Sequence, residues 1–142
     1  MIKVLIVDPD PCELYRTCEI AAGLGIEDML CASTFEDALC CLQEGPALII
    51  AEADQIPKSK ENPEPVSGDA LIQAIKLQAR GAIIIGQMAN VRGERMFSAL
   101  RSGADDVVDK GVLPSRLLDK IPIWVSVAEK SHAVDKLVRC HG

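Results

Sequence analysis

Residues 2–11 of the chain read IKVLIVDPDP. Its first six residues, Ile2 to Val7, form a nearly continuous apolar run, which is typical of a central strand in a parallel sheet. Asp10 can cap a helix, Pro11 suits the first helical position, and Glu13 would complete a capping box. The stretch therefore predicts a buried strand that leads directly into a helix, as in α/β folds.

The same alternation recurs along the rest of the chain. Strands are predicted at Asp28–Ala32, Ala47–Ala51, Ala82–Ile85 and Asp106–Asp109. Helices are predicted after Ser33, which forms a capping box with Glu36, and at Asp69–Gln78, Arg92–Arg101 and Pro114–Ile121. Strands that alternate with helices predict a doubly wound α/β fold with a five-stranded parallel sheet. Residues 55–67 are polar, contain three prolines and are predicted to form a loop.

The C-terminal region is predicted to be an additional helical segment. Pro122 should kink or restart the preceding helix, because proline cannot donate a hydrogen bond to the previous turn. A further helix is expected at Ile123–Val138. We therefore divide the chain into a domain at residues 1–121 and a helical extension at residues 122–142. Trp124 would either cover the core or anchor a dimer.

Composition excludes several classes of function. The chain has 142 residues, enough for one domain, and a formal net charge of −6, which argues against nucleic-acid binding through a basic surface. No apolar run approaches the roughly 20 residues of a membrane helix, and the N-terminus does not read as a signal peptide. Six cysteines occur without a Cys-x-x-Cys pair, so a zinc site is disfavoured. We expect a cytoplasmic protein whose cysteines are small buried hydrophobes.

Acidic residues and one lysine follow the predicted strands. Asp8 and Asp10 follow the first strand, Glu52 follows the third, and Lys110 follows the fifth. In parallel α/β sheets the functional site lies at the carboxyl ends of the strands. These four side chains are therefore expected to converge.

Two segments resemble the receiver domain of bacterial response regulators. They are VLIVD at residues 4–8 and ALRSGADDVVDK at residues 99–110, and the resemblance extends over residues 1–121. It implies the flavodoxin-like receiver fold. It also implies an aspartate at the end of the third strand that accepts a phosphoryl group from a histidine kinase. An acidic pair after the first strand would hold Mg²⁺, and a lysine would neutralise charge on the phosphoryl oxygens.

The resemblance assigns site residues, but some positions of the chain differ from the family pattern. Asp8 matches the first metal-binding residue, whereas Pro9 stands at the second, where Asp10 would be a weak substitute. Glu52 falls at the phosphoacceptor position, and Asp54 is a fallback acceptor. Lys110 matches the lysine.

Other family positions are altered too. An alternative count of the third strand puts Ala53 at the acceptor position. Met88 or Gly86 stands where a hydroxyl is expected after the fourth strand, and Val107 stands where an aromatic is expected. Gly111 replaces a proline.

Three hypotheses follow. The first is an atypical receiver that is not an enzyme and binds a protein, namely a histidine kinase, another regulator, an output protein or a second copy, without efficient phosphorylation. Its partner surface would lie around Arg92–Arg116. The second is a working Mg²⁺-dependent phosphoacceptor that uses Asp8, Asp10 and either Glu52 or Asp54. The third is an unrelated flavodoxin-like enzyme or nucleotide binder, which the lack of a glycine-rich loop after the first strand disfavours.

Overall fold

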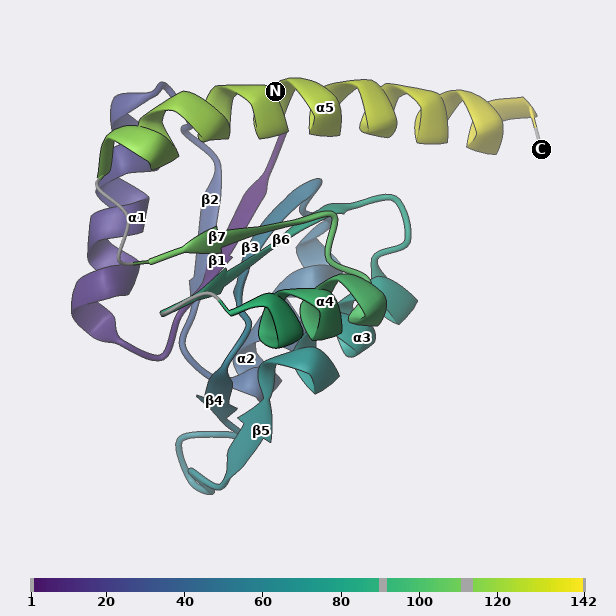
Figure 1. Cartoon of the computed structure of the whole chain (residues 1–142). Coiled ribbons are helices and arrows are strands. Elements are labelled where there is room, and N and C mark those ends of the chain that lie inside the picture. Colours follow the sequence, from purple (N-terminus) through teal and green to yellow (C-terminus); the bar gives the residue numbers. More distant parts are fainter. Residues whose placement is uncertain (1, 90–91, 111–113, 142) are drawn as a thin grey trace.

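The computed structural model describes residues 2–89, 92–110 and 114–141, and its centre is a parallel sheet (Figure 1). The five strands lie in the order β2-β1-β3-β6-β7, and every neighbouring pair is parallel. Their bounds are β1 Val4–Val7, β2 Met29–Ala32, β3 Leu48–Glu52, β6 Ile83–Met88 and β7 Asp106–Asp109. The predicted five-stranded parallel sheet is confirmed, although β6 extends three residues beyond its predicted end.

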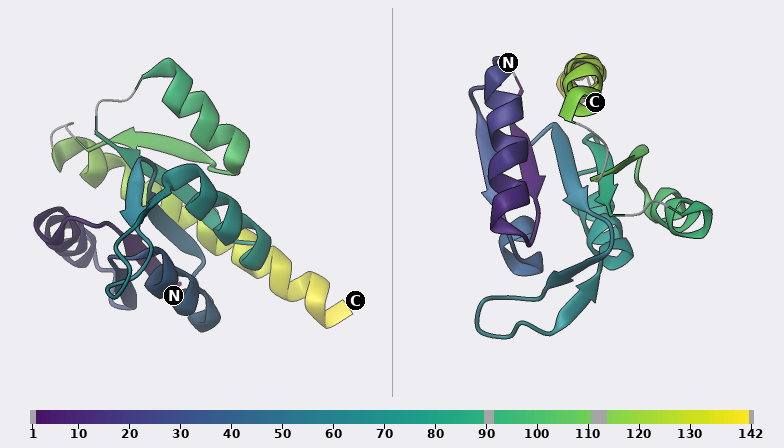
Figure 2. Two further views of the ribbon diagram at one scale, coloured as in Figure 1. Left: turned by 90° about the horizontal axis from the view of Figure 1, so that it is seen from below. Right: turned by 60° about the vertical axis from the view of Figure 1, so that its left-hand side comes forward.

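Helices cover both faces of the sheet (Figure 2). One face carries α1 and α5, and the other carries α2, α3 and α4. Their bounds are α1 Pro11–Gly23, α2 Phe35–Cys41, α3 Gly68–Gln78, α4 Gly93–Ser102 and α5 Pro114–His141, with a short 3₁₀ helix η1 at Leu42–Glu44. The fold is therefore doubly wound, as the alternation of strands and helices predicts.

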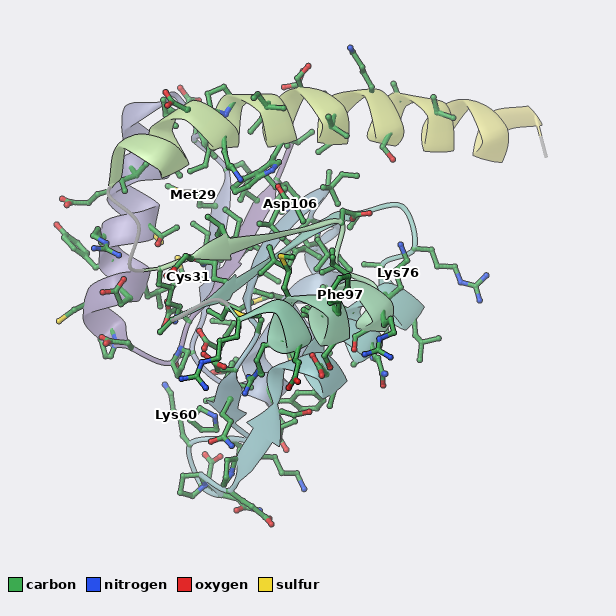
Figure 3. The ribbon with its side chains drawn as sticks, in the orientation of Figure 1. Met29, Cys31, Lys60, Lys76, Phe97 and Asp106 are labelled. Atoms are coloured by element: carbon green, nitrogen blue, oxygen red, sulfur yellow. The ribbon has the colours of Figure 1, made fainter. Side chains whose placement is uncertain are left out.

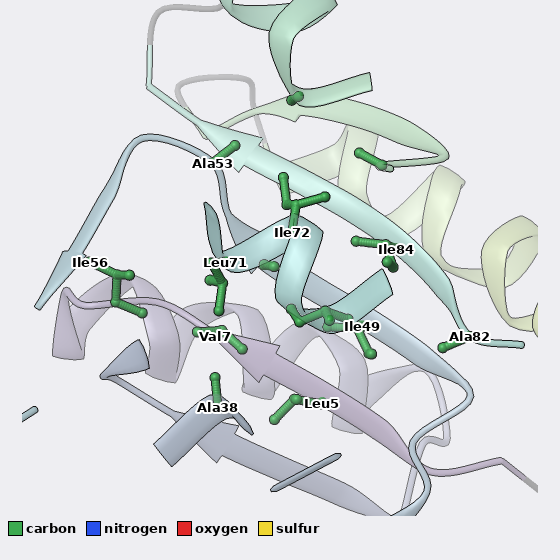
Figure 4. Packing of buried hydrophobic residues seen from close by; sticks show 14 of the residues in the cluster. Leu5, Val7, Ala38, Ile49, Ala53, Ile56, Leu71, Ile72, Ala82 and Ile84 are labelled. Carbon is green, nitrogen blue, oxygen red and sulfur yellow. The ribbon is translucent and has the colours of Figure 1, made fainter. Parts of the chain in front are cut away.

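Strand alternation divides the core into two layers. Leu5, Val7, Ile49 and Ile84 point toward α2, α3 and α4 and pack around Leu71 (Figure 4). The intervening residues point the other way, so Val4, Ile6, Leu48, Ile50 and Ile85 pack against α1 and α5. This parity also fixes the face on which the last residue of each strand lies.

Residues 55–67 correct the predicted loop. They contain a two-stranded antiparallel hairpin with β4 at Gln55–Pro57 and β5 at Pro65–Ser67. Ile56 lies opposite Val66, and its side chain is buried in the core beside α3. This burial stabilises the hairpin, while Pro57 and Pro65 pair with each other at its far end. Prolines are tolerated there because short edge strands leave some backbone N–H groups unpaired.

Of the two helix caps predicted from the sequence, one is confirmed and one differs by a residue. Asp10 caps α1 as expected, accepting hydrogen bonds from the backbone N–H groups of Cys12 and Glu13. The cap of α2 is Thr34 instead of Ser33, because the Thr34 hydroxyl accepts from the Asp37 N–H at 3.1 Å. Serine and threonine are both favourable caps, so residue type alone did not locate the cap.

The predicted restart of the helix at Pro122 is wrong, because α5 continues through it to His141. Pro122 is exposed, whereas Ile121, Trp124 and Ala128 form a buried stripe at helical spacing. Packing of this stripe against the sheet holds the helix together across the proline. Trp124 therefore covers the core, and its indole N–H donates to Asp106 at 3.4 Å. The division at residue 122 stays a prediction.

The expected burial of the cysteines is also wrong for the residues that the structure describes. Cys12, Cys31 and Cys40 are exposed, and Cys18 and Cys41 are half-buried. Branched aliphatic residues and alanines make up most of the core, and Cys18 and Cys41 pack against its margin. Within the described ranges, no helix has the length and apolar character that a membrane crossing requires.

Candidate functional site

Four polar side chains lie on the α1–α5 face at the carboxyl ends of the strands. They are Asp8, Glu52, Gln87 and Lys110. Each lies two positions after a buried apolar residue that faces α1 and α5, so it points to the same side of the sheet. These apolar residues are Ile6, Ile50, Ile85 and Val108. Parallel strands bring these ends to one edge of the sheet. The expected convergence of Asp8, Glu52 and Lys110 at this edge is found in the structure.

Lys110 bridges two buried carboxylates. Its Nζ lies 3.0 Å from Asp8 Oδ2 and also forms an ion pair with Glu52 Oε2. Only 1% of the Asp8 side chain, 6% of the Glu52 side chain and 13% of the Lys110 side chain are exposed. Water therefore screens these charges little, and each carboxylate depends on the ammonium for compensation. We call Asp8, Glu52 and Lys110 the carboxylate–lysine cluster.

Backbone contacts fix the cluster in place. The Asp8 N–H donates to Ala32 on β2 at 3.0 Å, and the Lys110 N–H donates to Met88 on β6 at 2.9 Å. The Lys110 carbonyl accepts from the Arg16 guanidinium of α1 at 3.3 Å. Strand β2 thus positions Asp8, while strand β6 and helix α1 position Lys110.

Asp10 has the role of helix cap that the sequence also predicted for it. Its exposed carboxylate caps α1, accepting from Cys12 at 2.9 Å and Glu13 at 3.4 Å. Its backbone N–H donates to Asp8 Oδ1 at 2.9 Å. Both oxygens of Asp8 are therefore engaged, one by Asp10 and one by Lys110.

Asp54, the fallback acceptor, lies outside the cluster. Its carboxylate forms an ion pair with Arg95 of α4, and the same guanidinium donates to the Ala53 carbonyl at 3.4 Å. Ala53, the alternative acceptor position, is buried against apolar residues. Arg95 lies within the segment expected to form a partner surface, and its guanidinium also holds the segment after β3 to α4.

The pKa values of the cluster reflect burial and mutual interaction. Burial raises the pKa of Glu52 above its ordinary value of 4.5, and the Asp8 charge adds to this rise. The Lys110 ammonium and the Asp54 backbone oppose it without cancelling it. Burial is the largest influence on the pKa of Lys110 and lowers it. The hydrogen bonds and charges of Glu52 and Asp8 outweigh burial and raise that pKa above 10.5.

Gln87 is a site residue that the sequence reasoning missed. The sheet register places it opposite Glu52, whereas the counts along the sequence had selected Met88 or Gly86. Met88 faces the opposite core layer, and Gly86 packs beside Ala53 and Val107. Gln87 is buried, and its Nε2 has no hydrogen-bond partner among the described residues. A lone polar residue in the run Ile83–Met88 was the available signal.

Gly68 is a second residue without a sequence signal. A Cβ there would lie 2.1 Å from the Ala53 carbonyl carbon, and the Gly68 N–H donates to Asp54 at 2.8 Å. Only glycine allows α3 to approach the end of β3 this closely. Gly68 thereby helps to set the path of the chain after Glu52.

The residues present do not fit the Mg²⁺ ion that the resemblance implies. Asp8 and Glu52 both face the Lys110 ammonium, Pro9 supplies no side-chain oxygen, and Asp10 caps α1. A hard divalent cation needs several oxygen ligands, and a neighbouring ammonium opposes its binding. Across the described residues, no group of three or more His, Cys, Asp or Glu side chains is arranged to hold a metal ion. Gly111 lies outside the described residues.

Comparison with solved structures identifies the fold. A CheY-like response regulator receiver domain protein from Methanospirillum hungatei JF-1 is 26% identical, with a TM-score of 0.74, over 92% of this chain and 98% of its own. The BeF3-activated DrrB receiver domain is 23% identical, with a TM-score of 0.75, over 89% of this chain and 98% of its own. NtrX from Brucella abortus is 21% identical, with a TM-score of 0.80, over 96% of this chain but only 29% of NtrX.

No family profile and no curated protein matches the sequence. The structural neighbours are receiver domains of response regulators, the signalling modules of two-component systems, and the chain has their fold. The receiver fold inferred from residues 4–8 and 99–110 is thereby confirmed.

Proposed function

We propose that the chain is an atypical receiver domain that works as a protein-interaction module and is not efficiently phosphorylated. The observation that carries this proposal is the position of Lys110 between Asp8 and Glu52. In a working receiver the lysine neutralises charge on an incoming phosphoryl group, and the acidic pair holds a metal ion. Here the ammonium is already occupied by both carboxylates.

The chemistry of Glu52 supports the same proposal. Glutamate is one methylene longer than aspartate, so its carboxylate would lie roughly 1.3–1.5 Å from the position an aspartate takes, and a displacement of about 1 Å can cost ~100-fold in rate. Glu52 is also buried and paired, which restricts its approach to a phosphoryl donor. Its single charge beside Lys110 is only a partial imitation of a phosphoryl group, which carries nearly twice the charge.

The proposed partner is a protein. A histidine kinase, another regulator, an output protein and a second copy of this chain are the candidates, since receiver domains act by binding such partners. The net charge of −6 disfavours nucleic acid, and we place the protein in the cytoplasm. The expected contact surface is α4, β7 and the start of α5, where Phe97 is 60% exposed (Figure 3). The side chains of residues 114–118, including Arg116, lie outside the described residues.

The second candidate is a Mg²⁺-dependent phosphoacceptor. It is favoured by the half-buried Asp54, which lies two residues after the end of β3. Its ion-pair partner Arg95 is exposed and could release it. This candidate requires Asp54 to turn toward Asp8, away from its contact with α4.

Incubation with acetyl phosphate and Mg²⁺, followed by intact mass measurement, separates the two candidates. We expect no stoichiometric phosphoryl adduct on the wild-type protein. A full adduct that disappears in Asp54→Ala would support the working receiver with Asp54 as acceptor. A full adduct that disappears in Glu52→Ala would show that Glu52 is phosphorylated and would overturn the proposal. Arg92→Ala serves as a control outside the site.

A further inference from the structure

Two cysteines on different elements bring their sulfur atoms together at one edge of the fold. Cys18 lies on α1 and Cys31 lies on β2, and their Sγ atoms are 2.9 Å apart. The two residues are 13 positions apart in the sequence, with the turn from α1 to β2 between them. The contact is therefore tertiary, and it lies outside the carboxylate–lysine cluster.

The environment of the pair makes one sulfur accessible. β2 is an edge strand of the sheet, and Cys31 is exposed at that edge (Figure 3). Cys18 is half-buried and packs against the core layer beneath α1. A reagent in solution can therefore reach Cys31 first.

We propose that Cys18 and Cys31 form a reversible disulfide by exchange with a low-molecular-weight disulfide. The Cys31 thiolate attacks one sulfur of the small disulfide, a mixed disulfide forms on Cys31, and one small thiolate leaves. The Cys18 thiolate then attacks the Cys31 sulfur, the protein disulfide forms, and the second small thiolate leaves. The two protein thiols are oxidised, the small disulfide is reduced to two thiols, and the two protons pass to the leaving thiolates.

The order of attack agrees with the properties of the two thiols. Burial, the hydrogen bond to Cys31 and the Cys31 charge raise the pKa of Cys18 to about 12, so Cys18 is a poor first nucleophile. Two of these three causes come from Cys31 itself. They disappear once Cys31 carries the small thiol, which makes Cys18 a better nucleophile in the second step.

The geometry requires little movement. A disulfide bond is about 2.05 Å long, so the sulfur atoms need to approach by roughly 0.9 Å. The bond would tie α1 to the edge strand β2. Cys31 directly precedes Ala32, whose carbonyl accepts the Asp8 N–H. The disulfide would therefore lie one residue from a backbone contact of the carboxylate–lysine cluster.

Mass spectrometry tests the pair with oxidised glutathione as the probe. The reduced full-length protein is incubated with oxidised glutathione, free thiols are alkylated, and the protein is cleaved after glutamate. Such cleavage is informative because Cys18, Cys31 and the pair Cys40–Cys41 fall in the separate peptides 14–19, 28–36 and 37–44. We expect peptides 14–19 and 28–36 to be cross-linked, and dithiothreitol to release them.

Three variants define the mechanism. Cys18→Ser should stop at a stable glutathione adduct on Cys31, because no second thiol resolves it. Cys31→Ser should leave Cys18 reduced. Cys12→Ser, at an exposed position near the start of the same helix, should form the cross-link as the wild type does.

Other results would overturn the proposal. Glutathione adducts on Cys12 or Cys40 without a cross-link would show that exposure alone governs the reaction. A disulfide between Cys31 and peptide 37–44 would show that Cys40 or Cys41, and not Cys18, is the partner of Cys31. Circular dichroism of each reduced variant checks that the fold persists, so a missing cross-link reports on chemistry and not on unfolding.

Discussion

Lys110 and Asp8 form an ion pair at the ends of two strands that are not neighbours. Their Nζ and Oδ2 atoms are 3.0 Å apart, yet β7 is separated from β1 by β6 and β3. The long lysine side chain spans this distance and meets Glu52 on β3 as well. The cluster therefore joins three strands through one ammonium group, which is shared by two carboxylates.

The first prediction concerns removal of the ammonium. Lys110→Met should lower the free energy of unfolding at neutral pH by about 3–5 kcal/mol, because it leaves two buried carboxylates uncompensated. Lys3→Met is the matched control, since Lys3 pairs with the exposed Glu44 at 3.4 Å and should lose no more than about 1 kcal/mol. Urea unfolding of both variants measures the difference. Equal losses would show that the cluster is not a stabilising bridge.

The second prediction concerns pH. The raised pKa of Glu52 means that the folded protein holds its proton more tightly than the unfolded chain. Wild-type stability should therefore fall as pH rises from 4.5 through the folded-state pKa, and this contribution should be constant above it. In Glu52→Gln this residue has no carboxyl group and does not titrate. Its stability relative to wild type should thus rise across the same window.

Urea unfolding of wild type and Glu52→Gln at a series of pH values measures this difference directly. Taking the difference removes the contributions of other acidic groups that both proteins share. A relative stability of Glu52→Gln that decreases with pH would mean that Lys110 dominates and that the pKa of Glu52 is lowered.

The third prediction concerns the turn after β3. Gly68→Ala should destabilise the protein by about 2–3 kcal/mol, because the new Cβ would overlap the Ala53 backbone, which cannot move aside like a flexible side chain. Gly93→Ala is the matched control, since Gly93 is likewise the first residue of its helix and nothing lies within 4 Å of its Cβ position. Thermal unfolding compares the two. A tolerated Gly68→Ala would contradict the close approach of α3 to β3.

The fourth prediction concerns α5. Pro122→Ala should stabilise the protein by about 1–3 kcal/mol, because alanine restores a helical hydrogen bond and has a higher helix propensity. Ser126→Ala, one turn later and also exposed, should change stability by less than about 0.7 kcal/mol. A destabilising Pro122→Ala would show that the proline itself shapes the helix.

Sequence reasoning was sufficient for the sheet and for the cluster. The apolar runs identified every strand of the sheet, and the rule that parallel strands end at one edge brought Asp8, Glu52 and Lys110 together. It failed where a contact depends on distant packing. Gln87 looked like part of a buried strand, Ile56 looked like part of a loop, and the approach of Gly68 to Ala53 has no local signal.

The cysteines and Pro122 illustrate the same limit. Residue type predicted burial for the cysteines and a kinked or restarted helix at Pro122. In the structure the described cysteines are exposed or half-buried, and α5 continues through Pro122. Cys31 lies on an outermost strand, and Pro122 lies on the solvent side of a helix that Ile121 and Trp124 hold to the core. Asp10 shows the reverse case, where a local cap predicted from sequence agrees with the structure.

The bridge at Lys110 is tested most directly by ¹⁵N-edited NMR of the lysine ammonium groups, recorded without and with Mg²⁺ and beryllofluoride. We predict a Lys110 signal protected from solvent exchange, displaced in Glu52→Gln, and unchanged when Mg²⁺ and beryllofluoride are added. Lys3, in its more exposed pair with Glu44, provides the reference for an ordinary surface lysine. A Lys110 signal that exchanges like Lys3, or that moves when the two ions are added, would contradict the closed site.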